Sequence, residues 1–312
     1  MGRQIEMVTN SKTISPAQHK LTELLDPTFM ARLDSLDFMS RKILQGKLQG
    51  ERRSKRRGQS VEFADHRPYV AGDDLRFVDW NVYARLGKLF LKLFMEEQDL
   101  TIHIAFDLSG SMTSGDPSKE RFVKRMVAAL GYISLVNNNR VTVSAFSEGV
   151  VGQLSNIRGR HTISQLADFL LTHSSEGLSD FDLSCRHLAG GRVGSGIMIV
   201  LSDFFFKEGF EAGLKRLLGR QYDLYLIQAL SPQEIDPKFS GDLKLVDIED
   251  EDVAEITVSH ALLKYYRRNL TAYCNDLKGF CAKRGIVYVL AKTSDSIESL
   301  ILNYLRRIQL LK

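Results

Sequence analysis

The chain has 312 residues, of which 44% are hydrophobic and 26% are charged, and its formal net charge is +4. This composition is typical of a globular protein and excludes extensive disorder, while so small a net charge gives no overall field favouring nucleic acid or an anionic membrane. Three cysteines are too few for a disulfide framework, the first residues lack the apolar core of a signal peptide, and no run of about 18 apolar residues occurs. We therefore expect a cytoplasmic protein without a transmembrane segment.

The first hundred residues show weak periodicity. Residues 1–20 are polar and aperiodic, which predicts a flexible N-terminus. Apolar residues recur at helical spacing over residues 26–49, and Asp26-Pro27 is a plausible start for one or two helices. Residues 61–84 are polar, aromatic and glycine-rich, which indicates ordered loop and short strand. We divide the chain into this N-terminus (1–20), a helical and irregular N-terminal region (21–98) and a larger domain (99–312).

From residue 88 onward, strands and helices alternate. Strands are expected at residues 89–94, 100–106, 141–146, 197–201, 224–228 and 286–290. Helices are expected from Asp116-Pro117, with the aspartate as cap, and at residues 163–171, 210–218, 261–283 and 296–308. This order predicts an α/β fold with a mostly parallel central sheet and helices on both faces. Residues 243–258 interrupt it with two strand-like runs around an acidic turn, which predicts a hairpin.

The strand at 100–106 runs directly into an acidic and hydroxyl-rich loop. Its residues are Asp107-Leu108-Ser109-Gly110-Ser111. In open α/β sheets, ligands bind at the carboxyl ends of the strands. An aspartate followed by hydroxyls two and four positions later places three oxygen donors on one side of a turning loop. Oxygen donors suit a hard cation such as Mg²⁺, or Mn²⁺ or Ca²⁺, and not zinc or copper.

Two further segments supply oxygen donors at comparable places. The strand at 197–201 ends in Ser202-Asp203, and a loop hydroxyl comes from Ser179. This order resembles the metal-ion-dependent adhesion site (MIDAS) of von Willebrand factor A domains. The resemblance implies that Asp107, Ser109, Ser111, Ser179 and Asp203 are the metal ligands. Serine at 179 departs from the more usual threonine, so Asp180 remains an alternative ligand. In a competing interpretation, Asp107 only caps the loop and the serines satisfy nearby backbone groups.

The segment upstream of the first central strand contains a set of short motifs: residues 57–63, Arg67-Pro68-Tyr69, 72–76, Asp79-Trp80 and Ala84-Arg85. These motifs resemble the signature of a bacterial family, the domain of unknown function fifty-eight. Together with the A-type domain, the resemblance covers about residues 40–300. In that family the domain is commonly encoded beside MoxR-type AAA+ ATPases. The resemblance therefore implies an adaptor or assembly role, with such an ATPase as the partner.

Nucleic-acid binding is the first alternative function. The run Arg52-Arg53-Ser54-Lys55-Arg56-Arg57 places five cations in six residues. No aromatic residues are interleaved for base stacking, so we favour a solvated linker, or pairing with Asp73, Asp74 and Asp79. Trp80 is interpreted as a structural anchor at a domain junction. The glycine-rich residues 190–196 and the acidic residues 247–252 are interpreted as a turn and a solvated hairpin tip.

Catalysis is the second alternative. Asp107 could be the nucleophile of a metal-dependent phosphohydrolase or phosphotransferase, whose strand-end loop is Asp-x-Asp. Here Ser109 replaces the second acid, and no Gly-x-Ser-x-Gly elbow occurs in the sequence. We therefore expect a binding protein and not an enzyme, one whose cation engages an aspartate or glutamate of a protein partner.

Overall fold

The computed structural model describes residues 21–39, 62–95, 100–190, 196–219, 222–238, 241–246 and 253–312. The chain divides into two compact units, a larger one of Met1–Gln45 with Leu100–Lys312 and a smaller one of Gly46–Asp99. The predicted flexible N-terminus at 1–20, the basic run at 52–57 and the hairpin tip at 247–252 lie outside the described residues. Within the described ranges, no helix is both long and apolar enough to cross a bilayer.

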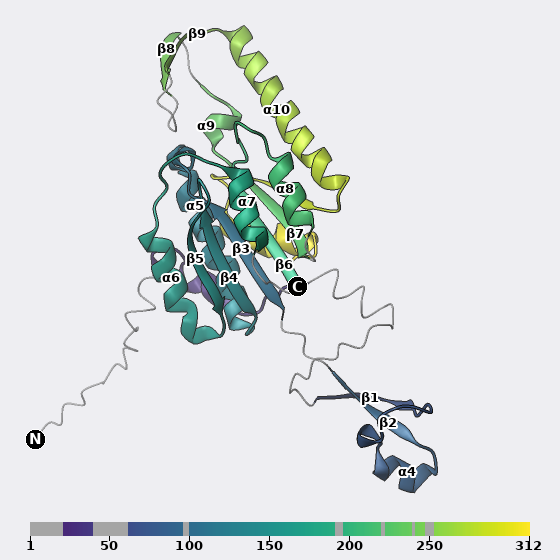
Figure 1. Cartoon of the computed structure of the whole chain (residues 1–312). Helices are drawn as coiled ribbons and strands as arrows, with labels where there is room; N and C mark the ends of the chain where they lie inside the picture. Colours follow the sequence, from purple (N-terminus) through teal and green to yellow (C-terminus); the bar gives the residue numbers. More distant parts are fainter. Residues whose placement is uncertain are drawn as a thin grey trace, which may run out of the picture. The chain divides into compact units, whose positions relative to one another are not determined.

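The larger unit is built on a six-stranded sheet in the order β10-β7-β6-β3-β4-β5 (Figure 1). Neighbouring strands pair in parallel, except that the edge strand β5 is antiparallel to β4. The predicted mostly parallel sheet is therefore confirmed. Its strands are β3 (Thr101–Asp107), β4 (Arg140–Phe146), β5 (Val150–Ile157), β6 (Gly196–Ser202), β7 (Tyr222–Leu230) and β10 (Val287–Lys292).

The burial of each strand explains whether it could be predicted from the sequence. Every residue of β3, β6 and β7 is buried, because helices cover both faces of the sheet, and these strands are near-continuous apolar runs. In contrast, β5 exposes much of its length and includes polar residues. This strand was not predicted from the sequence, because an edge strand has no comparable apolar run.

Helices cover both faces of the sheet, as predicted. One face packs against α2 (Pro27–Leu33), α5 (Lys119–Val136), α6 (Ile163–Thr172), α11 (Ile297–Ser299) and the π-helix η4 (Leu300–Leu305). The other packs against α7 (Phe181–Gly190), α8 (Glu211–Leu218) and the end of α10 (His260–Ala282). The sheet therefore separates two hydrophobic cores. The helix predicted at 296–308 is helical over residues 297–307, although its middle part, η4, has π-helical hydrogen bonding.

The N-terminal helix packs in the core of the larger unit. As predicted, α2 begins at Asp26-Pro27, and the Asp26 carboxylate accepts the backbone N–H of Thr28 (2.8 Å). Its buried Phe29 and Leu33 belong to the same core as α5. Residues 37–39 also pair with the C-terminal residues 310–312. The domain boundary predicted at residue 99 therefore places α2 outside the domain whose core it belongs to. The periodicity of a helix shows which of its faces is apolar, but it does not show which part of the chain packs against that face.

The predicted start of α5 is wrong by a few residues. The helix begins at Lys119, and its cap is Ser118, whose hydroxyl accepts the N–H of Arg121 (3.3 Å). Asp116-Pro117 instead belongs to the turn that follows the 3-10 helix η2 (Gly110–Thr113). The backbone N–H of Lys119 closes this turn on the carbonyl of Ser114 (3.1 Å).

After β7 the chain forms the short helix α9 (Pro232–Ile235) and then a hairpin. Its strands β8 (Gly241–Val246) and β9 (Val253–Val258) pair antiparallel, which confirms the predicted hairpin. The long helix α10 follows directly from this hairpin (Figure 1).

The smaller unit holds the antiparallel strands β1 (Glu62–Pro68) and β2 (Phe90–Met95), with the 3-10 helix η1 (Leu75–Phe77) and α4 (Trp80–Leu86) between them. Asp79 caps α4 and also pairs with His66 (2.9 Å) and Lys92 (3.4 Å). The hydrogen bond from His66 is the largest cause that lowers the pKa of Asp79 to about 2.

Two interpretations of the smaller unit can be compared with its contacts. Asp73 pairs with Arg67 (2.6 Å), and Asp74 pairs with Arg76 (2.6 Å), whereas the basic run proposed to pair with them lies outside the described residues. Trp80 is 59% exposed and contacts Tyr83 edge to face. It is therefore not a buried anchor of its own unit.

Candidate cation site

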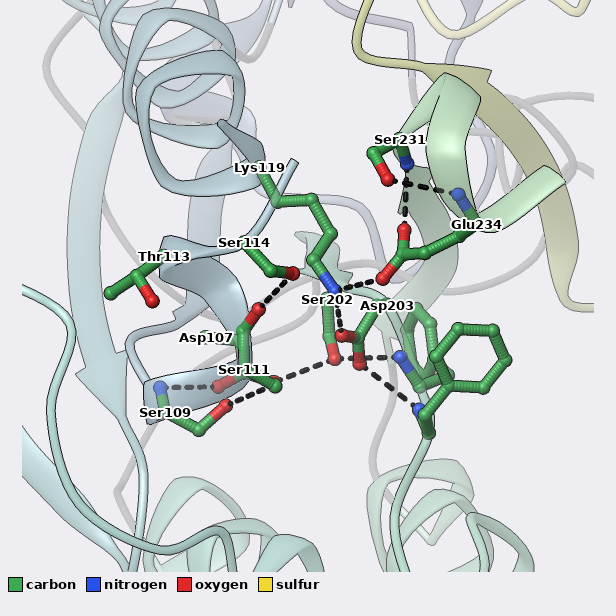
Figure 2. A network of polar contacts seen from close by, with 12 residues as sticks. Asp107, Ser109, Ser111, Thr113, Ser114, Lys119, Ser202, Asp203, Ser231 and Glu234 are labelled. Carbon is green, nitrogen blue, oxygen red and sulfur yellow. Dashed lines mark hydrogen bonds and ion pairs between the residues drawn. The ribbon is translucent and has the colours of Figure 1, made fainter. Parts of the chain in front are cut away.

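The site begins where β3 ends, at Asp107 (Figure 2). The Asp107 side chain is fully buried. Its Oδ1 accepts the backbone N–H of Ser109 (2.9 Å), and its Oδ2 accepts the hydroxyl of Ser202 at the end of β6 (2.6 Å). Because β3 and β6 are parallel neighbours, their carboxyl ends meet at one edge of the sheet, and this hydrogen bond joins the two ends.

The two motif serines lie beside Asp107. The Oγ atoms of Ser109 and Ser111 are 3.1 Å apart, within hydrogen-bonding distance. The 3-10 helix η2 fixes the turn that follows, since the hydroxyl of Ser114 donates to the carbonyl of Ser111 (2.7 Å). The structure therefore groups the three oxygen donors that the sequence motif predicted from this loop.

The loop that carries Ser179 is hydrogen-bonded to the motif loop. Gly110 donates its N–H to the carbonyl of Gly177 (2.9 Å), and Glu176 donates its N–H to the carbonyl of Leu108 (2.9 Å). The Oγ of Ser179 is buried and has no hydrogen-bond partner among the described residues. A buried hydroxyl without a partner is costly, and coordination to a cation would satisfy it.

The alternative ligand, Asp180, has a different task. Its carboxylate accepts the N–H of Leu183 (2.8 Å) in the first turn of α7, and its own N–H donates to the carbonyl of Ser147 (2.9 Å). Asp180 therefore caps α7. The buried hydroxyl of Ser179, in contrast, has no hydrogen-bond partner among the described residues, and this difference favours Ser179 over Asp180 as a cation ligand.

Asp203 follows β6 and is almost fully buried. Its Oδ1 accepts the N–H of Phe205 (3.0 Å), and its Oδ2 accepts a hydrogen bond from Nζ of Lys119 (2.5 Å). The same ammonium donates to the Oε1 of Glu234 in α9 (2.5 Å). Figure 2 shows Lys119 reaching from the start of α5 to lie between the two carboxylates.

The electrostatics of the site are those of clustered buried acids. Burial, followed by the nearby charge of Asp203, raises the pKa of Asp107 to about 7, although hydrogen bonds from Ser202 and Ser109 act in the opposite direction. Burial disfavours the charge of Lys119, but the carboxylates of Asp203 and Glu234 outweigh it and raise its pKa. Among the described residues, no cationic side chain pairs with Asp107.

The residues present fit a hard divalent cation. The donors are carboxylate and hydroxyl oxygens, which a hard cation prefers. Among the described residues no three or more histidine, cysteine, aspartate or glutamate side chains form a group that could hold a metal ion, so the serine hydroxyls would have to supply part of the ligand set. The three carboxylates of Asp107, Asp203 and Glu234 against the one ammonium of Lys119 leave two uncompensated negative charges when Asp107 is ionised. One divalent ion would neutralise them.

Three residues of this network were not anticipated from the sequence: Ser202, Lys119 and Glu234. A signal exists for each. Ser202 directly precedes the strand-end Asp203. Lys119 places a cation in the first turn of a helix, where the helix dipole disfavours it, so its position requires a compensating partner. Glu234 completes a Ser-Pro-x-Glu capping box with Ser231, a pattern that can be recognised in sequence.

The sheet topology and this edge define an α/β domain with a candidate cation site at the carboxyl ends of its parallel strands. The chain belongs to the family described as "Protein of unknown function DUF58", whose model matches residues 65–296. This confirms the family that the residues upstream of β3 predicted.

Relatives and solved structures resemble the chain over most of its length. Uncharacterized proteins of Mycobacterium bovis and Mycobacterium tuberculosis are 23% identical over 278 residues, covering 86% of this chain and 87% of theirs. The structure of BatB from Bacteroides thetaiotaomicron aligns with 67% of this chain and 98% of its own, at 16% identity and a TM-score of 0.41. The SpRpn10 VWA domain aligns with 66% and 95%, at 11% identity and a TM-score of 0.41.

Proposed function

We propose that this protein is a metal-dependent protein-binding adaptor. In this proposal Asp107, Ser109, Ser111, Ser179 and Asp203 hold Mg²⁺, or Mn²⁺ or Ca²⁺, and the cation engages an aspartate or glutamate of a partner. The observation that carries the proposal is the Asp107 carboxylate, which is fully buried at the sheet edge without a cationic partner among the described residues. A buried charge is costly unless it is paired, and a bound cation would pair it.

The donor set supports binding through an open coordination position. Hydroxyl oxygens carry no charge, so a cation held by three serines and two carboxylates remains a strong electrophile toward a further oxygen ligand. A partner carboxylate would complete the coordination through a charge-assisted and directional contact. Such a contact gives specificity as well as affinity, and it is lost when the metal is removed.

Binding is better supported than catalysis by the surroundings of Asp107. A carboxylate nucleophile must contact its substrate directly. The Asp107 side chain has no exposed surface, and Oδ1 and Oδ2 accept hydrogen bonds from the N–H of Ser109 and the hydroxyl of Ser202. Each oxygen keeps a second lone pair, which a small cation could use but a larger substrate could not reach.

The proposed partner is a MoxR-type AAA+ ATPase, or a client delivered to one, in the assembly or maturation of a protein complex. This part of the proposal rests on the family to which the chain belongs. The proposed setting is the cytoplasm, on the basis of cysteine usage: the three cysteines, Cys185, Cys274 and Cys281, are all free.

The first prediction concerns Asp107→Ala. The wild type should melt at higher temperature as Mg²⁺ or Mn²⁺ is added, since a ligand that binds only the folded state stabilises it. Asp107→Ala should stay folded without this response. Loss of one charge-assisted contact at an interface typically costs about 2 to 5 kcal/mol, so the ATPase should bind about thirty-fold to several-thousand-fold more weakly.

The measurement is a pull-down with the MoxR-type ATPase, with and without EDTA, alongside melting curves. Asp276→Ala provides the control, because Asp276 is an exposed aspartate on α10 and the substitution removes the same charge away from the site. Asp107→Ala should lose the ATPase as completely as EDTA-treated wild type. Equal recovery by all three proteins, with EDTA making no difference, would refute the proposal.

A further inference from the structure

Lys119 is the residue of the site whose presence the proposed ligand set does not explain. Its side chain is 1% exposed and it lies at the first position of α5. Lysine is rarely buried, because removing an ammonium group from water is costly unless it is paired. A cation is also disfavoured at a helix N-terminus. Both costs indicate that the ammonium group has a defined task in the site.

The two carboxylates that accept hydrogen bonds from Lys119 are also held in place by other hydrogen bonds. The second oxygen of Asp203 accepts the N–H of Phe205 (3.0 Å), and the second oxygen of Glu234 accepts the N–H of Ser231 (2.7 Å). Tyr266 of α10 donates its hydroxyl to the carbonyl of Glu234 (2.8 Å). The two carboxylates therefore form a fixed cradle, with one oxygen of each directed at Nζ of Lys119.

We propose that the Lys119 ammonium group is a built-in counter-ion of the cation site, which occupies Asp203 together with Glu234 and weakens the binding of a divalent cation. This inference rests on the proposed function, because it concerns the same site. An ion that engages Asp203 must share this carboxylate with Lys119, and the two positive charges repel each other. Lys119 is thus a residue that sets the affinity of the site.

The arrangement has a consequence for the metal-free protein. Without Lys119, Asp107, Asp203 and Glu234 would bring three negative charges together at the sheet edge. With Lys119 in place, Asp203 and Glu234 are paired at 2.5 Å each, and only Asp107 lacks a cation among the described residues. The ammonium group therefore stabilises the metal-free site and allows the cation to bind reversibly.

The test is calorimetric titration of Mn²⁺ into the full chain, with the wild type compared with Lys119→Met. Methionine fills a similar volume without charge, so we expect Mn²⁺ to bind about ten-fold more tightly or better. The melting temperature without metal should fall, and the rise on adding Mn²⁺ should be larger than in the wild type. Lys215→Met is the matched control: it makes the same substitution at an exposed position on α8, and should behave as the wild type.

Glu234→Gln provides a second variant in case Lys119→Met does not fold. In this variant the Lys119 ammonium group pairs with Asp203 alone, and the site has one negative charge fewer. Mn²⁺ should therefore bind more weakly than to the wild type. Equal or tighter binding would overturn the inference. Equal or weaker binding by Lys119→Met would overturn it in the same way.

The outcomes separate this inference from the proposed function. If the wild type binds no Mn²⁺ but Lys119→Met does, the proposed metal-dependent function fails while the inference stands, because the ammonium group then fills the place of the metal. If the wild type binds Mn²⁺ and Lys119→Met binds it no better, the inference fails while the metal-binding proposal stands. If neither binds, both fail.

Discussion

A buried carboxyl group without a positive partner holds its proton to higher pH than the same group in water. Asp107 is such a group: burial, then the charge of Asp203, raises its pKa from 3.8 to about 7. Between these two values the folded metal-free protein holds a proton that the unfolded chain has released. Its stability should therefore be greatest at the acid end of this window and fall as pH rises through it. A bound divalent cation should oppose this loss by stabilising the ionised form.

Asp107→Asn keeps the shape of the side chain but cannot ionise. Between about pH 4 and pH 7, in EDTA, the wild type should lose on the order of a few kcal/mol more unfolding free energy than the variant. Denaturant unfolding at a series of pH values measures both slopes. Identical slopes for the two proteins would show that the pKa of Asp107 is the same in the folded and unfolded states.

At the scale of elements, the neighbouring residues Ser179 and Asp180 have different roles, because only Asp180 caps the helix α7. Ser179→Ala removes a buried hydroxyl without a partner among the described residues, so metal-free stability should be unchanged or slightly higher. Its Mn²⁺ affinity should fall by about ten-fold, which corresponds to about 1.4 kcal/mol. Asp180→Ala removes the cap of α7 and should cost about 1 kcal/mol of stability, with Mn²⁺ affinity nearly unchanged.

Titration of Mn²⁺ and chemical unfolding of the two variants, side by side, decide between these residues. The reverse pattern, with Asp180→Ala losing the metal and Ser179→Ala keeping it, would assign the ligand to Asp180. The competing interpretation, in which the serines serve only the backbone, requires both variants to keep the wild-type response.

The same scale shows how far the sequence could predict this site. Asp107 and Asp203 could be placed together because β3 and β6 are apolar runs, and the carboxyl ends of parallel strands meet at one edge. The contact of Lys119 with Glu234 could not be predicted in this way. These residues are 115 positions apart, and they meet only because the start of α5 and the helix that follows β7 come together in the folded chain.

The other differences between the predicted and the observed elements occur at the sheet edge and in a turn. The strand β5 lies at the sheet edge and mixes polar with apolar residues, so its pattern is not that of a buried strand. The predicted start of α5, Asp116-Pro117, differs from the observed start, Lys119, because two residues that can cap a helix, Asp116 and Ser118, lie two positions apart. Both residues are of types that cap helices, and the turn after η2 places Ser118 at the cap.

At the scale of the whole molecule, the larger unit is discontinuous in sequence. Residues 21–39 pack in it, the smaller unit intervenes, and the chain returns at β3. Residues on either side of the smaller unit also pair, since Asp37 and Lys312 exchange backbone hydrogen bonds (3.2 and 2.8 Å). The larger unit therefore includes contacts between Asp37 and Lys312, which are far apart in sequence, and a boundary drawn by sequence alone at residue 99 excludes part of this unit.

The last prediction tests this organisation through Phe29 and Trp80, two large aromatic residues that both lie before residue 99. Phe29 is 1% exposed and belongs to the core formed by α5 and the sheet, whereas Trp80 is 59% exposed in the smaller unit. Phe29→Ala should therefore lower the unfolding free energy of the larger unit by about 3 to 5 kcal/mol, as truncation of a buried aromatic side chain does. Trp80→Ala should change it by less than about 1 kcal/mol, because exposed positions contribute little. Denaturant unfolding followed by circular dichroism measures both. Equal stability of the two variants would mean that α2 is dispensable for the core and that the larger unit begins at β3.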